Sequence, residues 1–136
     1  MPSLNFAFQH HYQATASRIL IPVTLVYGGL EIDLRVRFDS AASDCVFDRY
    51  YAEQIGIDLE SGDRREFRTL TGSFAAYSHE VTMRTLGLEW SALVFFHDSA
   101  NAANAFLGRR GWLDRLRIGL VHYDRQIFLG NYDDNF

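Results

Sequence analysis

Two neighbouring segments near the start of the chain show the alternation of half-buried β-strands. Residues 30–38 alternate apolar and charged side chains, so one face of this segment should be buried and the other exposed. The preceding residues, 18–27, are rich in β-branched and aliphatic side chains. Gly28 and Gly29 lie between the two segments, and glycine readily adopts the positive φ angles of a tight turn. The pattern predicts an antiparallel hairpin.

Short strands dominate the rest of the chain. Residues 65–86 carry β-forming side chains on both sides of Thr71 and Gly72, which predicts a second hairpin. Residues 88–96 are apolar enough for a strand that is buried on both faces. The other predicted elements are one or two helical turns at 48–57 ended by Gly56, a helical segment at 109–116 that places Trp112, Leu113 and Leu116 on one face, and closing strands at 118–123 and 125–130. The fold class is therefore all-β, with one or two short helices.

An internal repeat supports a fold built from two similar halves. The segment 23–42 aligns without a gap on 81–100, and both copies contain the turn sequence Gly-Leu-Glu. Each copy reads as a strand, a glycine turn, a second strand and a loop of small residues. In this alignment Asp39 corresponds to His97. Chance similarity between short hairpins is the alternative, and the matching turns favour duplication.

Composition narrows the partners and the compartment. The chain has 136 residues, 48% of them hydrophobic, which is enough for one domain with its own core. We expect residues 1–17 to form an N-terminal extension or edge segment and 18–136 to form the domain. The net charge of -4, without a basic stripe, makes nucleic acid and anionic membranes unexpected partners. With a single cysteine, Cys45, and no apolar run near the ~20 residues that cross a bilayer, the protein is predicted to be cytoplasmic.

The loop after residue 38 is the first candidate for chemistry. Asp39 directly follows a predicted buried strand, and the small residues Ser40, Ala41 and Ala42 leave room for a substrate backbone. Locally, the same residues also suit an ordinary turn in which Asp39 or Ser40 caps the next element.

Several segments together resemble the retropepsin-like aspartic proteases, especially their bacterial members. They are RFDSAASDCVF, YYAEQIGIDL, the hairpin around Thr71 and Gly72, and FLGRRGWLDRLRIGLVHYDRQIFL, so that the resemblance spans about residues 19–129. It implies a closed acid-protease lobe with an internal pseudo-two-fold axis and a flap hairpin over the substrate. It also implies that Asp39 is the catalytic carboxylate, and that Leu70, Thr71, Gly72 and Ser73 belong to the flap.

One carboxylate is not enough for this chemistry. Two carboxyls about 3 Å apart share one proton, so that one activates a water while the other polarises the scissile carbonyl. Because the second copy of the repeat offers His97, the second Asp39 is expected from a homodimer, with a peptide or protein as substrate.

The match departs from the family at Ala41, where glycine is usual. A catalytically impaired peptide-binding or dimerisation module on the same fold is therefore the alternative to an active endopeptidase. A barrel that binds small apolar ligands is a third hypothesis, suggested only by the aromatic content.

The remaining polar residues leave several roles open. Arg109 either braces the active-site loop through a carboxylate such as Asp44 or is a solvated side chain. Asp44 either contacts the substrate backbone or ends the loop. Cys45 is interpreted as a small buried hydrophobe. The five histidines lack the paired spacing of a zinc site, and no glycine-rich phosphate loop is present, so neither a metal nor a cofactor is predicted.

Overall fold

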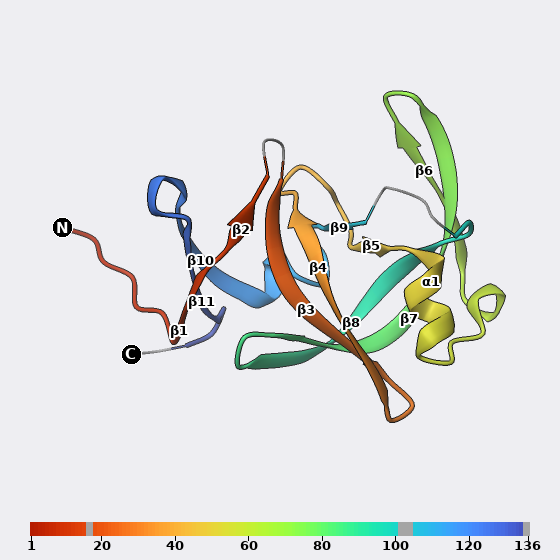
Figure 1. The fold of residues 1–136 in the computed structure, drawn as a ribbon, viewed down its shortest axis with the longest axis horizontal. Helices are drawn as coiled ribbons and strands as arrows, with labels where there is room; N and C mark the ends of the chain where they lie inside the picture. Colours follow the sequence, from red (N-terminus) through yellow and green to blue (C-terminus); the bar gives the residue numbers. More distant parts are fainter. Residues whose placement is uncertain (16–17, 101–104, 135–136) are drawn as a thin grey trace.

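The computed structural model describes residues 1–15, 18–100 and 105–134, and strands dominate it (Figure 1). The strands are β1 (Phe8–His11), β2 (Gln13–Ala14), β3 (Ile19–Tyr27), β4 (Leu30–Phe38), β5 (Val46–Phe47), β6 (Arg64–Thr69), β7 (Gly72–Thr85), β8 (Leu88–His97), β9 (Phe106–Leu107), β10 (Leu116–Val121) and β11 (Gln126–Asn131). The helix α1 (Arg49–Gln54) and the 3-10 turns η1 (Leu59–Ser61), η2 (Leu113–Arg115) and η3 (His122–Asp124) connect them. The all-β prediction is confirmed.

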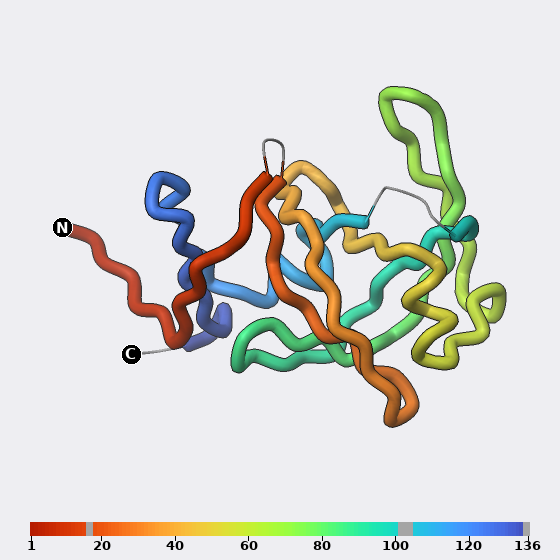
Figure 2. Tube along the Cα trace, viewed as in Figure 1, coloured from red at the N-terminus to blue at the C-terminus, as the bar shows by residue number. Residues whose placement is uncertain are grey.

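The larger sheet closes on itself. Its strands follow the order β2-β3-β4-β9-β5-β8-β7-β6, and an additional pairing of β3 with β7 joins the two ends of the inner part. The strands from β3 to β7 therefore form a closed barrel, while β2 and β6 extend it at the edges. The hairpin of β6 and β7 projects away from this barrel, as the trace in Figure 2 shows.

The two halves of the barrel repeat one hairpin. In β3 and β4, Val23 pairs with Leu34, and in β7 and β8, Val81 pairs with Ala92. Both pairings are those that the sequence repeat superimposes, and the rest of the two ladders follows with the same offset. The register thus supports the internal pseudo-two-fold axis.

The segments that follow the two hairpins cross between the halves. After β4 the chain runs to β5, which pairs in parallel with β8, and after β8 it runs to β9, which pairs in parallel with β4. Each half therefore completes the sheet of the other, and the end of β4 lies against the segment that follows β9.

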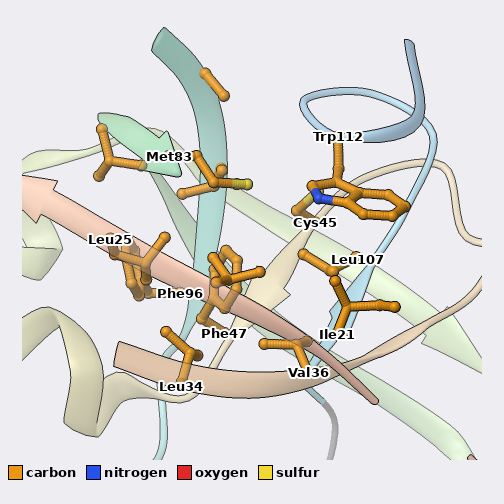
Figure 3. Packing of buried hydrophobic residues seen from close by; sticks show 14 of the residues in the cluster. Ile21, Leu25, Leu34, Val36, Cys45, Phe47, Met83, Phe96, Leu107 and Trp112 are labelled. Atoms are coloured by element: carbon orange, nitrogen blue, oxygen red, sulfur yellow. The ribbon is translucent and has the colours of Figure 1, made fainter. Parts of the chain in front are cut away.

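Apolar side chains from both halves fill the barrel (Figure 3). Ile21 and Leu25 of β3 and Met83 of β7 are fully buried, and so is Trp112. Full burial of one such side chain stabilises the fold by about 1.5–3 kcal/mol. Because one cluster joins the two halves, we treat the barrel as one folding unit.

Of the two predicted helical segments, the first forms a helix and the second does not. Asp48 caps α1 by accepting a hydrogen bond from the Tyr50 N–H at 2.8 Å, and Gly56 follows the helix with a φ of 78°. The predicted helix at 109–116 is wrong, since only the single turn η2 forms there. Asp114 accepts the Gly111 N–H at 3.0 Å, and Leu116 already pairs with Asn131 in the next sheet.

The ends of the described chain form a separate 3-stranded sheet of order β1-β11-β10. Phe8 of β1 pairs with Leu129, and its ring packs on Gly87 at the turn between β7 and β8, where a Cβ would lie 2.3 Å from the ring. The terminal sheet is thereby fastened to the barrel. Among the described residues, no helix is long and apolar enough to cross a membrane.

Candidate active site

Asp39 lies immediately after β4 in a turn made by its own backbone and side chain. Its N–H donates to the Leu107 carbonyl at 3.0 Å, and its Oδ1 accepts the Ala41 N–H at 3.0 Å. Its carbonyl accepts the Ala42 N–H at 3.2 Å. Asp39 is half-buried. The bond from the Ala41 N–H holds its carboxyl in place, and its position in the lining of a groove leaves it accessible to a ligand.

The residues after β9 hold this loop in place through backbone hydrogen bonds and close packing. The backbone N–H groups of Arg109 and Arg110 donate to the carbonyls of Ala42 and Ser43, both at 2.9 Å. Gly108 lies so close to the loop that a Cβ there would be 2.1 Å from the Asp44 carbonyl oxygen. Residues 107–109 therefore act through their backbone and through the absence of a side chain at Gly108.

Cys45 lies at the same junction and is completely buried. Its sulfur accepts the Gly108 N–H at 3.4 Å. Burial raises the pKa of the thiol from 9.0 to about 12, which leaves almost no thiolate at neutral pH. The interpretation of Cys45 as a buried hydrophobe is confirmed.

Asp44 is the buried anchor of the loop. Its side chain is only 5% exposed and accepts two hydrogen bonds from Arg110, at 3.1 and 3.0 Å. Arg65 of β6 and the Ser43 hydroxyl add bonds of 3.0 and 2.9 Å. Of the two roles left open for Arg109, the ion pair with Asp44 is taken by Arg110 instead, and the Arg109 side chain is exposed.

A groove of about 880 Å³ separates the Asp39 loop from the tip of the β6–β7 hairpin. The turn of that hairpin is Leu70 and Thr71, one position earlier than predicted, because Thr69 pairs with Gly72. From the predicted site, the lining residues are Asp39, Ala41, Ala42, Leu70 and Thr71.

The other predicted site residues lie around the groove. Gly72 and Ser73 begin β7, just behind the hairpin tip, and Ser40 is exposed in the loop. Asp44 anchors the loop through its ion pairs, and the backbone N–H of Arg109 bonds to the loop.

The residues that complete the groove were not predicted from the sequence. Arg37 and Arg68 bring positive charge, and the aromatic side chains are Phe67, Phe74 and Phe106. Arg37 fits the exposed face of an alternating strand, so its pattern gave no signal of a site. The three phenylalanines lie 28 or more residues from Asp39 along the chain and reach the groove only through the hairpin and β9.

His97, the counterpart of Asp39 in the second half, has a different environment. It is 7% exposed, and its ring stacks on Phe74 with the centroids 4.5 Å apart. Its Nδ1 accepts the Ser99 N–H at 3.1 Å. The second half thus supports the base of the hairpin and brings no carboxylate to the groove at this position.

Within the described parts of the chain, no three His, Cys, Asp or Glu side chains come together as metal ligands. The geometry places a partly accessible carboxylate in an open groove.

The closed barrel, its pseudo-two-fold repeat and the projecting hairpin are the fold of the retropepsin-like aspartic proteases, as the sequence resemblance predicted. A crystal structure of such a protease from Rickettsia conorii superimposes with a TM-score of 0.65 over 91% of this chain and 99% of that chain. The sequences are 16% identical, so the likeness concerns the fold. No family model matches the sequence, and no curated protein matches it either.

Proposed function

We propose that the chain is one subunit of a homodimeric aspartic endopeptidase. The observation that carries this proposal is the place of Asp39: its carboxyl lines the groove under the β6–β7 hairpin, on a barrel with the retropepsin-like fold. The Ala41 N–H that binds Oδ1 holds the carboxyl in a defined orientation. Orientation of the acid and the base is a large part of catalysis by proton transfer.

The chemistry requires the Asp39 residues of two chains. One ionised carboxylate takes a proton from a water whose oxygen adds to the scissile carbonyl carbon, while the protonated carboxyl of the other chain hydrogen-bonds the carbonyl oxygen. The tetrahedral intermediate then collapses, its nitrogen takes a proton, and the C–N bond breaks. Because His97 occupies the corresponding place in this chain, a second copy is the natural source of the second carboxyl.

The hairpin tip is proposed to act as a flap. Leu70 and Thr71 face Asp39 across the groove, and Gly72 and Ser73 give the tip little bulk. An extended peptide between the flap and the loop could add its backbone to these edges as a further strand. Ser40, which is exposed beside Asp39, is proposed to hydrogen-bond across the dimer.

Ala41 is compatible with this role. Positive φ angles among the described non-glycine residues occur only at Leu86 and Arg125, so Ala41 does not occupy a conformation that needs glycine. Ala41 lines the groove, and its methyl group takes space there that a glycine would leave open. That narrowing favours the second candidate, a peptide-binding or dimerisation module with impaired catalysis.

The test compares the wild-type chain with Asp39→Asn on a peptide library analysed by mass spectrometry. We expect cleavage by the wild type and a loss of about 10²–10⁴-fold in Asp39→Asn, because the base is removed with little change in size. Asp33→Asn, an exposed carboxyl on the same strand, is the control and should cleave normally. Undiminished cleavage by Asp39→Asn would exclude Asp39 from the mechanism.

The same preparations decide between the proposals. Sedimentation should show two chains at micromolar concentration, and a strictly monomeric protein that cleaves peptides would contradict the shared site. Peptide binding without any cleavage would support the impaired module.

The completely buried Cys45 suits our proposal that the protein works in the reducing cytoplasm.

A further inference from the structure

Arg37 is the least expected residue in the groove. It lies at the end of β4, two positions before Asp39, and both side chains line the same groove. Its Nε is buried and has no hydrogen-bond partner among the described residues. Buried donors are nearly always paired in proteins, so one without a protein acceptor needs a physical explanation.

The rest of the Arg37 side chain is well supported. Its guanidinium carbon lies 5.3 Å from the centroid of the Phe106 ring, within the range of a cation–π contact. The aromatic ring covers one face of the guanidinium and accepts no in-plane hydrogen bond. The terminal N–H groups of Arg37, which make no hydrogen bond to the described residues, are thus left for a ligand that enters the groove.

The charge of the groove agrees with this interpretation. Arg68 on the hairpin side is a second cation, and Asp39 is the single carboxylate among the described residues that line the groove. In the proposed dimer, the two Asp39 carboxyls share one proton, so they do not neutralise all of the arginine charge. Uncompensated positive charge therefore remains beside the reacting bond.

We propose that Arg37 is a specificity-determining residue that binds a carboxylate of the peptide substrate, namely a Glu or Asp side chain near the scissile bond. The planar fork of arginine matches a carboxylate with two parallel hydrogen bonds, and such charge-assisted bonds are about twice as strong as neutral ones. The inference rests on the proposed peptidase function and adds the class of substrate to it.

The first experiment measures kcat/KM on pairs of peptides that differ only by Glu or Gln, placed in turn at each position beside the cleaved bond. We expect the wild type to prefer Glu at one position by about 10- to 100-fold, the range of a charge-assisted hydrogen bond. Arg37→Gln should lose this preference, and Arg68→Gln should weaken it. Arg35→Gln, an exposed arginine on the same strand, is the matched control and should keep it.

Two further arms separate the alternatives. Amidation of the peptide C-terminus tells a side-chain carboxylate from a terminal one: a preference that disappears on amidation would overturn the assignment to a Glu or Asp side chain. A structural role of Arg37, for example in holding Asp39, would make Arg37→Gln slower on the Glu and Gln peptides alike. That result would also overturn the proposal.

A binding measurement keeps this test distinct from that of catalysis. Calorimetry with Asp39→Asn should show tighter binding of the Glu peptide than of the Gln peptide, whether or not the wild type turns either over. Cleavage with equal kcat/KM for both peptides would refute the acidic preference and leave the peptidase in place. Equal binding of the two peptides, or binding of neither, would refute it as well.

Discussion

The two hairpins of the barrel share one backbone pattern and end in opposite chemical environments. After β4 the chain presents Asp39, which is half-buried, held by the Ala41 N–H and open to the groove. After β8, at the equivalent place, His97 is buried against Phe74. The same ladder register thus carries a candidate catalytic group in one half and a packing group in the other.

This difference shows how two halves with the same fold can have different roles. The second half uses its strand end to support the hairpin that covers the groove, and the segment after β9 supports the Asp39 loop. In the proposed peptidase, the second carboxyl would therefore come from a second chain.

The largest effect is expected at Gly108, where the second half touches the Asp39 loop. Gly108→Ala places a Cβ 2.1 Å from the Asp44 carbonyl oxygen, which is backbone and cannot move aside cheaply. We expect a loss of about 4 kcal/mol or more in the free energy of unfolding, measured with urea. Gly130→Ala is the control, because its nearest neighbour is the flexible Asp134 side chain at 3.3 Å, and it should cost less than about 1 kcal/mol.

The reactivity of the Cys45 thiol provides a second measurement of the contact between Gly108 and the Asp39 loop. The raised pKa keeps the thiol neutral in the folded state, so its contribution to stability is complete below the ordinary value of 9.0 and is lost as pH rises toward about 12. At pH 8 the wild-type thiol should resist a thiolate-specific reagent, whereas Gly108→Ala should react rapidly. Equal protection of Cys45 in both proteins would show that the loop tolerates the added methyl group.

A smaller effect is expected when the two halves are made chemically alike. His97→Asp places a carboxylate in a buried, aromatic environment, and we expect it to destabilise the fold by about 2–3 kcal/mol. His97→Asn, which keeps a polar group near the Ser99 N–H, should lose only about 0.5–1.5 kcal/mol with the ring contact. Peptide cleavage by a monomeric His97→Asp protein would show that the second half can supply the missing carboxyl.

The smallest effect distinguishes two adjacent arginines. Arg110→Gln removes the paired hydrogen bonds to Asp44, and it should lower stability by about 1 kcal/mol because the arginine side chain is 64% exposed. Arg109→Gln should change thermal stability very little, since Arg109 supports the loop through its backbone. A larger loss of stability in Arg109→Gln than in Arg110→Gln would assign the bracing of the loop to the Arg109 side chain instead.

The sequence by itself determined the fold class, the two hairpins and their relation. Alternation at residues 30–38, the glycines at 28 and 29 and the repeated Gly-Leu-Glu turn are local signals, because strand faces and turn conformations depend on neighbouring residues. The same local signals identified the loop at Asp39 and the short helix ended by Gly56. They overestimated the helix at Trp112, because pairing of Leu116 with Asn131 outweighs the helical periodicity there.

Only the tertiary structure decided which side chains meet. The ion pair of Asp44 joins three distant segments through Arg65 and Arg110, and the choice of Arg110 over Arg109 depends on the direction in which the chain leaves Gly108. Arg37 has the pattern of an exposed strand residue, and it lines the groove because β9 and the hairpin fold over that face. Periodicity reports which face of a strand a residue occupies, whereas the partners on that face are set by the long-range pairing of strands.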